Sequence, residues 1–425
     1  MTPAHSNLKT KDSGIEWVGS IPYHWEVLPF YSFATEVSHP NTGLKERNLL
    51  SLSYGRIVRK DMDRLEGLTP ASFEGYNIIE ADDIVFRLTD LQNDQTSLRS
   101  ARATERGIIT SAYVTVRPHA SSRFFDYLMR SYDTTKVFYG IGGGIRQSMK
   151  FADLKRLPVV VPPVHEMEEI SSFLDRATTR VDALIAKKIR FIDLLREKRQ
   201  ALITHAVNKG LNDGAPMKFS GVEWLGEVPA TWDVAPLRVF LTLRRDIVGS
   251  SSVTTKLLSL TLKGVIERDL ENPTGKMPAS FDSYQRVSPG DMVFCLFDMD
   301  ETPRTVGISP QQGMITGAYT VFRPSSKLWA SFLYYFFIHV DEYKRLKPFY
   351  KGLRKTIRPG PFLSIQVPRP PVEVAEQIVA HLNRATSRID ALAAKTERSI
   401  ELLREHRTAL ITAAVTGKID LREAM

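Results

Sequence analysis

Apolar residues recur at steps of three and four positions along two long segments of the chain. The segments begin after Pro162-Pro163 and Pro370-Pro371, and neither contains another proline or glycine before Gly210 or Gly417. This spacing places the apolar side chains on one face of an α-helix and predicts two helices of about 40 residues, each roughly 60 Å long. The two apolar series are Ile170, Leu174, Ala177, Val181, Leu184, Ile192, Leu195 and Leu202, and Ile378, Leu382, Ala385, Ile389, Leu392, Ile400, Leu403 and Leu410.

The apolar stripe of each predicted helix is narrow, and the other faces are rich in arginine, lysine and glutamate. A helix of this kind is not stable alone and needs an apolar partner. Because both helices carry the same stripe, we expect them to pair as an antiparallel coiled coil.

The segments that precede the helices show short apolar runs separated by turns. Residues 84–86 and 292–294 are predicted as buried strands, each preceded by an aspartate, Asp83 or Asp291. Residues 108–116 and 314–322 are also predicted as strands. They stop at Arg117-Pro118 and Arg323-Pro324, because proline removes a hydrogen-bond donor from a sheet. The aromatic run 329–340 is about a dozen residues long, which is too short to span a bilayer, because that needs about 20 residues. We therefore predict it as a buried helix.

The two halves of the chain repeat each other. Residues 162–207 return as residues 370–415 with about 28 of 46 positions identical and no gap. The two copies lie 208 residues apart, far more than the about 20–50 residues of a solenoid unit, so the repeat is a duplication of whole domains. The expected fold class is α+β, with two globular mixed domains separated by two long antiparallel coiled-coil helices in an internal pseudo-two-fold duplication. The predicted divisions are 1–160 and 213–368 for the globular domains, and 161–212 and 369–425 for the helices.

Charge points to a polyanionic partner. Lysine and arginine number 57 against 48 aspartates and glutamates, so the formal net charge is +9. Such an excess favours nucleic acid, although many basic proteins bind none. A duplicated chain can imitate a two-fold dimer, which suits the near two-fold symmetry of duplex DNA. The single cysteine, Cys295, and the polar segment 1–12 lead us to expect a cytoplasmic protein without disulfide, signal peptide or membrane partner.

No catalytic constellation is recognisable in the sequence. The chain lacks a His-Glu-x-x-His helix and a phosphate loop that ends in Gly-Lys-Ser/Thr. It also lacks the cofactor and target-base motifs of a DNA methyltransferase. The glycine run 140–144 is interpreted as a flexible turn, and its basic counterpart, residues 351–355, favours a DNA-facing loop. We therefore expect no cofactor and no metal in this chain.

Polar loops beside the predicted strands are the candidate base-reading elements. Residues 89–95 include Gln92 and Asn93, and residues 298–304 include Arg304. Asparagine and glutamine can pair with adenine, and arginine can pair with guanine. The two loops differ inside while their flanks align, as expected if each domain reads its own sequence. The alternative is that they are solvated turns.

Basic residues near these loops are candidates for contacts to DNA bases or phosphates. The basic residues on the long helices, by contrast, are interpreted mainly as a solvated face. Trp17, Trp25, Trp224 and Trp232 are predicted to be core residues because they recur at the same places in both copies. The DNA candidates are Arg56, Arg59, Lys60, Arg99, Arg102, Arg146 and Lys150 in the first domain, and Lys263, Arg268, Arg304, Lys351, Arg354, Lys355 and Arg358 in the second.

Three repeated motifs together resemble the specificity subunits of type I restriction-modification systems. The first motif begins each half and contains Glu-Trp-Val/Leu-Gly, a proline and a second tryptophan, at residues 16–27 and 223–234. The second is the Pro-Pro element before each helix, followed by Glu168 and Ile170 or by Glu376, Gln377 and Ile378. The third is the end of each helix, residues 195–203 and 403–411. The first copy departs from the family pattern at Glu169, where the second copy has Gln377.

The resemblance implies a subunit without catalysis of its own. It would bind a bipartite duplex DNA target with one target recognition domain per half-site, and helix length would set the spacer between the half-sites. It would recruit two methyltransferase subunits, which use S-adenosylmethionine, and restriction-translocase subunits, which use ATP and magnesium. The sequence does not decide between separate subunits and a fused nuclease-methyltransferase.

Two other classes of function were weighed against this one. A coiled-coil scaffold whose globular ends bind protein is disfavoured, because the mixed domains diverge in loops that carry base-reading residue types. A catalytic nuclease or methyltransferase is disfavoured by the missing motifs.

Overall fold

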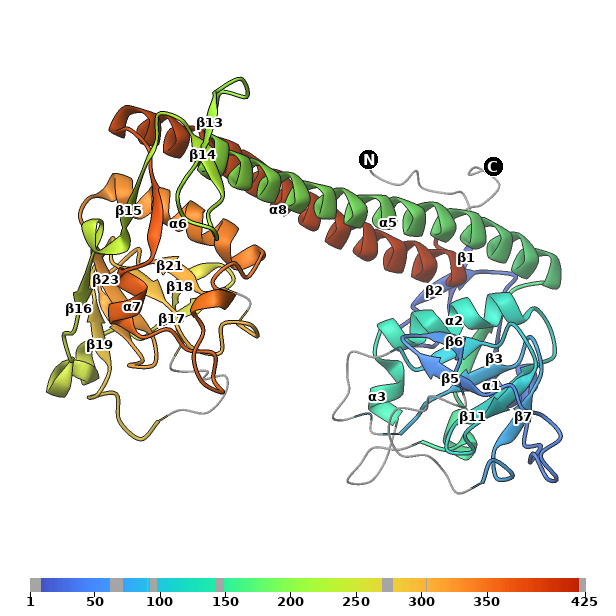
Figure 1. Cartoon of the computed structure of the whole chain (residues 1–425). Helices are drawn as coiled ribbons and strands as arrows, with labels where there is room; N and C mark the ends of the chain where they lie inside the picture. The colour runs from blue at the N-terminus through green and yellow to red at the C-terminus, as the bar shows by residue number, and fades with distance from the viewer. Residues whose placement is uncertain are drawn as a thin grey trace. The chain divides into compact units, whose positions relative to one another are not determined.

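The computed structural model describes residues 9–61, 72–89, 91, 98–141, 149–269, 278–302 and 304–419. They form two compact units (Figure 1). Unit 1 consists of residues 1–188 and 398–425, and unit 2 consists of residues 189–397. Among the described residues, no helix has both the length and the apolar character that crossing a membrane requires.

Unit 1 is built around an antiparallel sheet in the strand order β4-β11-β8-β9, with four small two-stranded sheets beside it, β1-β2, β3-β12, β5-β6 and β7-β10. Its elements are β1 (Thr10–Asp12), β2 (Ser20–Pro22), β3 (Glu26–Pro29), α1 (Phe30–Phe33), β4 (Ala34–Glu36), β5 (Leu50–Ser53), β6 (Arg56–Arg59), β7 (Asn77–Ile79), β8 (Ile84–Phe86), β9 (Ser100–Arg102), β10 (Gly107–Ile109), β11 (Val114–Pro118), α2 (Ser122–Thr134), α3 (Val137–Ile141), α4 (Phe151–Leu154) and β12 (Pro158–Val161).

Unit 2 repeats this plan, with a sheet in the order β16-β23-β20-β21 and the pairs β13-β14, β15-β24, β17-β18 and β19-β22. Its elements are β13 (Met217–Phe219), β14 (Glu227–Pro229), β15 (Asp233–Pro236), η1 (Leu237–Val239), β16 (Leu241–Arg244), η2 (Gly249–Thr254), β17 (Leu258–Thr261), β18 (Gly264–Glu267), β19 (Gln285–Val287), β20 (Met292–Phe294), β21 (Val306–Ile308), β22 (Gly313–Ile315), β23 (Thr320–Pro324), α6 (Lys327–Glu342), η3 (Lys347–Phe349), α7 (Pro359–Leu363) and β24 (Gln366–Arg369).

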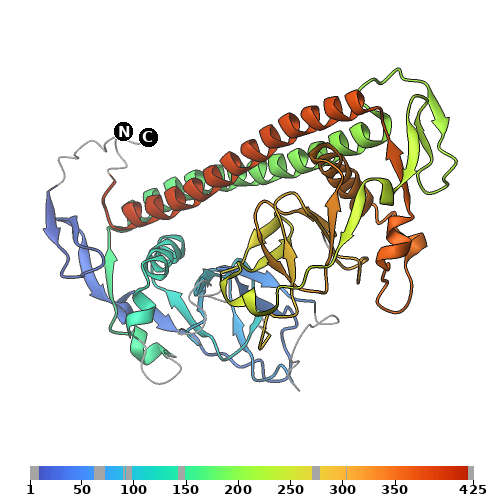
Figure 2. The ribbon, with the colours of Figure 1, turned by 90° about the vertical axis from the view of Figure 1, so that its left-hand side faces the viewer.

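The two long helices are α5 (Val164–Lys209) and α8 (Val372–Val415). The prediction of two long helices after the proline pairs is confirmed. Figures 1 and 2 show the helices side by side. In unit 1, Arg407 of α8 forms an ion pair with Asp182 of α5 at 3.0 Å, and in unit 2, Arg199 of α5 pairs with Asp390 of α8, also at 3.0 Å. The two ion pairs join equivalent residues of the two copies of the repeat.

Apolar packing shows that the two helices run antiparallel within each unit. In unit 1, Leu174 near the start of α5 shares a core with Ile411 near the end of α8. In unit 2, Ile203 near the end of α5 shares a core with Leu382 near the start of α8. The predicted antiparallel pairing is therefore present in each unit.

Each predicted long strand is two strands separated by a turn. Residues 108–116 were expected as one strand, but β10 ends at Ile109 and β11 begins at Val114. The Thr110 side chain explains the break, because its hydroxyl accepts a hydrogen bond from the backbone N–H of Ala112 at 3.3 Å. Thr316 does the same to Ala318 at 3.4 Å in the second copy. A threonine bond of this kind competes with strand pairing.

The aspartates before the buried strands anchor their sheets. Asp83 is fully buried and accepts hydrogen bonds from Arg117 at 2.7 and 2.9 Å. Asp291 is also buried and accepts one from Arg244 at 2.5 Å. Arg323 on β23, the counterpart of Arg117, lies 3.9 Å from Asp291, so unit 2 keeps this ion pair and adds the hydrogen-bonding Arg244 on β16. A buried carboxylate needs such a partner to offset its lost hydration.

The repeated tryptophan motif holds the end of a long helix. Trp25 and Trp232 are buried, as predicted. Gly417, just beyond α8, has a left-handed backbone (φ 70°), and a Cβ there would lie 2.3 Å from Pro22 and 3.2 Å from Trp25. Gly210, just beyond α5, repeats the conformation (φ 79°), and a Cβ there would lie 3.5 Å from Trp232. The shared motif therefore serves a structural contact that each unit makes once.

A second repeated contact docks a helix of each globular part on the long helices. In unit 1, Tyr127 of α2 donates a hydrogen bond to Asp175 at 2.8 Å, and Ser131 donates to Thr412 at 3.0 Å. In unit 2, the equivalent Tyr335 of α6 donates to Asn383 at 2.8 Å. His339 takes the place of Ser131 and lies 3.0 Å from Thr204.

We expect His339 to make the stability of unit 2 depend on pH, an effect that unit 1 lacks at the equivalent Ser131. Burial, aided by Arg345, lowers the pKa of His339 from 6.5 to about 4. The unfolded state therefore binds more protons between these values, so stability is complete above pH 6.5 and is lost as the pH falls towards 4. We expect a loss of about 3 kcal/mol over this window. Urea unfolding at several pH values checks it, and His339→Ser, which copies Ser131 of unit 1, should remove most of the slope.

Candidate nucleic-acid interface

Two predicted DNA-facing loops of unit 2 lie against each other. The loop after β20 contains Asp298 and Asp300, and the loop before α7 contains Arg354 and Lys355. Arg354 donates to Asp298 at 2.7 Å, and Lys355 donates to Asp300 at 2.6 Å. The backbone N–H of Asp298 also donates to the Arg354 carbonyl at 2.8 Å. The structure thus joins two loops that lie more than fifty residues apart in sequence into one surface.

Each of these loops contains one residue with a strained backbone conformation. Asp298 and Lys355 both adopt left-handed backbone, with φ of 47° and 43°. A non-glycine residue in this region costs about 1–3 kcal/mol and is frequent at functional sites. Hydrogen bonds from Arg354 and Lys355 lower the pKa of Asp298 and of Asp300, so both carboxylates are ionised at neutral pH. A DNA phosphate that approached Arg354 or Lys355 would therefore have to replace a carboxylate partner.

Three other candidates of unit 2 lie in or near these loops. Lys351 and Arg358 are exposed in the second loop. Arg304 is half-buried and its Nη1 lies 3.5 Å from the hydroxyl of Tyr334. Contacts between these residues and DNA remain predictions.

The hairpins β5-β6 and β17-β18 carry further candidates. In unit 1, Arg56 and Lys60 are exposed, and Arg59 donates to Glu105 at 2.8 Å. In unit 2, Lys263 lies exposed at the equivalent hairpin turn, and Arg268 follows β18 half-buried. Both hairpins therefore present basic side chains. Lys60 and Arg268 occupy the same position of the repeat, whereas Arg56, Arg59 and Lys263 have no basic counterpart.

The remaining candidates of unit 1 have different surroundings. Arg99 is fully buried, and it donates to the hydroxyl of Tyr139 at 3.3 Å and to the carbonyl of Thr89 at 3.1 Å. Its guanidinium therefore forms hydrogen bonds inside the protein, and the structure does not favour it as a DNA contact. Arg102 forms an ion pair with Asp82 at 2.7 Å, and Lys150 is exposed at the N-terminal end of α4. Gln92, Asn93 and Arg146 lie outside the described residues.

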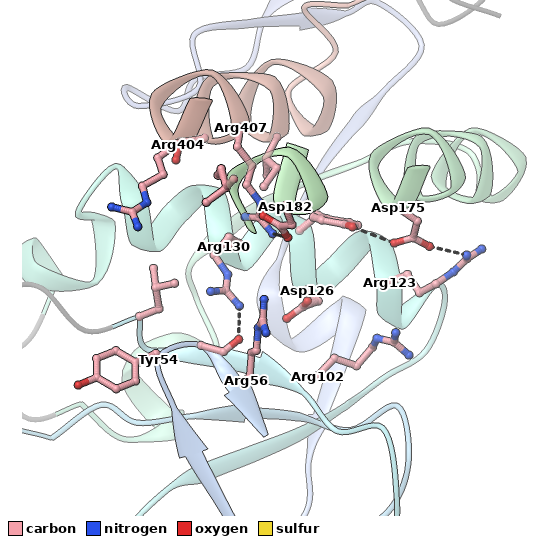
Figure 3. Close-up of a pocket in the computed structure, with 16 residues that line it drawn as sticks. Tyr54, Arg56, Arg102, Arg123, Asp126, Arg130, Asp175, Asp182, Arg404 and Arg407 are labelled. Atoms are coloured by element: carbon pink, nitrogen blue, oxygen red, sulfur yellow. Dashed lines mark hydrogen bonds and ion pairs between the residues drawn. The ribbon is translucent and has the colours of Figure 1, made fainter. Parts of the chain in front are cut away.

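Sequence reasoning missed a group of arginines on α2. Figure 3 shows Arg123 and Arg130 beside Arg56 and Arg102 around a pocket of unit 1, with Arg404 and Arg407 of α8 on its other side. The spacing of Arg123, Tyr127 and Arg130 at i, i+4 and i+7 places all three on one face of α2. That face meets the long helices through Tyr127. Together with the predicted coiled coil, this spacing in the sequence could have indicated that α2 presents arginines toward the long helices.

Comparison with known proteins identifies similar chains. No family model matches the sequence. The type I restriction enzyme EcoKI specificity subunit of Escherichia coli (strain K12) is 23% identical over 210 residues, which is 46% of this chain and 44% of that protein. The matched region therefore spans less than half of that relative's length.

Solved structures match nearly the whole chain in fold. One, described as the structural basis of complex assembly and conformational transition of the type I R-M system, gives a TM-score of 0.66 at 14% identity and covers 94% of this chain and 99% of its own. The HsdS subunit of Thermoanaerobacter tengcongensis gives a TM-score of 0.51 at 14% identity and covers 94% and 98%. At this level of identity the match shows the fold. The chain thus has the fold of type I restriction-modification specificity subunits and is similar in sequence to one of them, which confirms the resemblance predicted from its repeated motifs.

Proposed function

We propose that this chain is the DNA sequence-specificity subunit of a type I restriction-modification enzyme. The observation that carries the proposal is the repeat itself. In two units of the same plan, Tyr127 and Tyr335 make equivalent contacts from the globular part to a long helix, while the polar loops differ. One target recognition domain would then read each half of a bipartite duplex site.

In this proposal the chain has no catalysis of its own and directs other subunits to the DNA. Two methyltransferase subunits would methylate adenine N6 with S-adenosylmethionine. Restriction-translocase subunits would use ATP and magnesium to cleave unmodified DNA. The basic side chains on the hairpins and on the loops of unit 2 would contribute phosphate and base contacts.

The long helices carry repeated exposed leucines that suit a partner present in two copies. Leu184 returns as Leu392, and Leu194 returns as Leu402, and all four side chains are 41–49% exposed. Leu184 and Leu402 belong to unit 1, whereas Leu392 and Leu194 belong to unit 2. A single exposed leucine is common on any protein. Equal exposure at equivalent positions supports a docking surface that occurs once per unit.

Charge substitution of one leucine pair should remove one methyltransferase subunit. We expect Leu184→Asp with Leu402→Asp to lower the ratio of methyltransferase to this chain from two to one, because a buried, unpaired carboxylate would oppose docking. Leu194→Asp with Leu392→Asp should have the same effect. Mass measurement of the complex in solution checks both. Retention of two subunits in both double variants would exclude this surface, and Val239→Asp, at an exposed apolar site outside the two long helices, serves as the control.

A further inference from the structure

Unit 1 contains a polar pocket that the proposed function does not use. The pocket measures about 470 Å³ and opens between α2, the β5-β6 turn and the two long helices. Six arginines and three aspartates line it, as Figure 3 shows, so positive charge exceeds negative charge. They are Arg56, Arg102, Arg123, Arg130, Arg404, Arg407, Asp126, Asp175 and Asp182.

Internal ion pairs neutralise half of these arginines. Arg123 pairs with Asp175 at 2.8 Å, Arg407 pairs with Asp182 at 3.0 Å, and Arg102 pairs with Asp82 outside the pocket. Salt bridges within the protein therefore explain why these three arginines are present.

The other three arginines form no ion pair with a carboxylate of the described residues. Arg130 donates to the carbonyls of Gly55 and Ser100, at 2.7 and 3.1 Å, and its charge acts on Asp126 and Asp133 without an ion pair to either carboxylate. The side chains of Arg56 and Arg404 form no hydrogen bond or ion pair with any residue that the structure describes. Within the described part of the chain, three guanidinium groups at one pocket therefore have no carboxylate at ion-pair distance.

One carboxyl oxygen of Asp126 adds an acceptor without a donor, although the carboxyl also takes part in a hydrogen bond with the backbone of Arg102. Its Oδ1 is enclosed and receives no hydrogen bond from the described part of the chain. Figure 3 shows Asp126 in the pocket near Arg56 and Arg102. Burial raises the pKa of Asp126, against the opposing effect of Arg130 and Arg102. An enclosed acceptor of this kind is costly unless a donor from elsewhere reaches it.

The second copy shows that this lining is not needed to dock a recognition domain. On the long helices, Asp182, Arg404 and Arg407 return as Asp390, Arg196 and Arg199. In the globular part, however, the positions of Arg56, Asp126 and Arg130 are taken by Gly264, Tyr334 and Ile338. The equivalence of Tyr127 and Tyr335, which make the same helix contact, fixes this alignment. Unit 2 thus docks through the same tyrosine without a single one of these charges.

We propose that the pocket of unit 1 binds a phosphate group of a ligand that also carries a hydrogen-bond donor. Arg56, Arg130 and Arg404 would supply the positive charge for the phosphate. Asp126 would accept the donor, a hydroxyl or amino group of the kind a nucleotide offers. The volume lies within the range of small-molecule sites, about 300–1,000 Å³. The proposal does not depend on the proposed function, because a free phosphate can be tested without DNA.

The first test is titration of the full-length chain with inorganic phosphate at constant ionic strength, with chloride as the reference salt. We expect phosphate at about ten times its Kd to raise the Tm of unit 1 by about 3–6 °C. Arg404→Gln should weaken phosphate binding at least tenfold. Arg196→Gln, which changes the equivalent helix position of unit 2, should leave it unchanged. No phosphate effect, or the same effect in the Arg404→Gln variant, would overturn the proposal.

A second measurement separates the role of Asp126 and the source of the phosphate. Adenosine monophosphate should bind more tightly than inorganic phosphate, and Asp126→Asn should abolish that gain while inorganic phosphate still binds. Equal binding of both ligands by the unsubstituted chain would refute the donor requirement. Repetition with bound duplex DNA then identifies the source, since loss of phosphate binding indicates a DNA phosphate and its persistence indicates a free molecule.

Discussion

Replacement of Trp232 by alanine is expected to lower the free energy of unfolding of unit 2 by about 3–5 kcal/mol. The side chain is 1% exposed, and its ring lies 6.3 Å from that of Phe332 in an edge-on arrangement. It also packs against the backbone of Gly210, where α5 ends. Removal of the indole would leave a cavity at the point where the globular part meets the helix. Urea unfolding and hydrogen exchange at residues 217–229 measure the loss.

The equivalent substitution in unit 1 provides the matched comparison. Trp25→Ala should cost as much or more, because the Trp25 indole also donates a hydrogen bond to Glu166 at 2.8 Å. Each substitution should increase exchange in its own unit first. Tyr31→Ala, at an exposed aromatic, is the control and should change stability by less than about 0.5 kcal/mol. A loss below about 1 kcal/mol for both tryptophans would refute the role given to this motif.

Lengthening both long helices is expected to change the spacer of the recognised DNA site and not its two half-sites. Four residues inserted after Lys188, with four more after the equivalent Thr396, extend the antiparallel pair by about 6 Å. Paired insertions keep the helices in step, whereas an insertion in α5 alone would leave part of it without a partner. At 3.4 Å per base pair, we expect the spacer to grow by about two base pairs. The methylated motif of the variant measures this directly.

Two outcomes would contradict the view that the helices act as a ruler. One is a changed half-site, which would mean that the insertion altered base reading. The other is an unchanged spacer in a folded, active variant. An insertion of four residues after Gly214, in the loop between α5 and β13, is the control and should leave the site as it was.

The long helices could be predicted from the sequence because one local period decides them. The apolar positions from Ile170 to Leu202 repeat without a glycine or proline, and the duplication supplies the pairing partner. The buried tryptophans were predictable for a similar reason, since residues that recur in both copies serve what the copies share. Trp25 and Trp232 indeed make the same contact with a helix end in each unit.

The strands and the site were harder to predict because tertiary contacts decide them. A hydroxyl bond at Thr110 interrupts a run that is apolar enough for one strand. The burial of Arg99 depends on Tyr139 and on the carbonyl of Thr89, and no local pattern brings these together. The pocket of unit 1 combines residues from the β5-β6 turn, α2, α5 and α8. Only the folded chain places them side by side.

The most direct test of the proposed function is a genome-wide map of N6-methyladenine. The map would be made in a host that lacks the system and expresses this chain with the methyltransferase encoded beside it. We predict one bipartite motif, with two specific halves around a fixed unspecified spacer, that disappears when this chain is omitted. An active methyltransferase that produces no such motif, or the same motif without this chain, would contradict the assignment and favour a scaffold that binds protein.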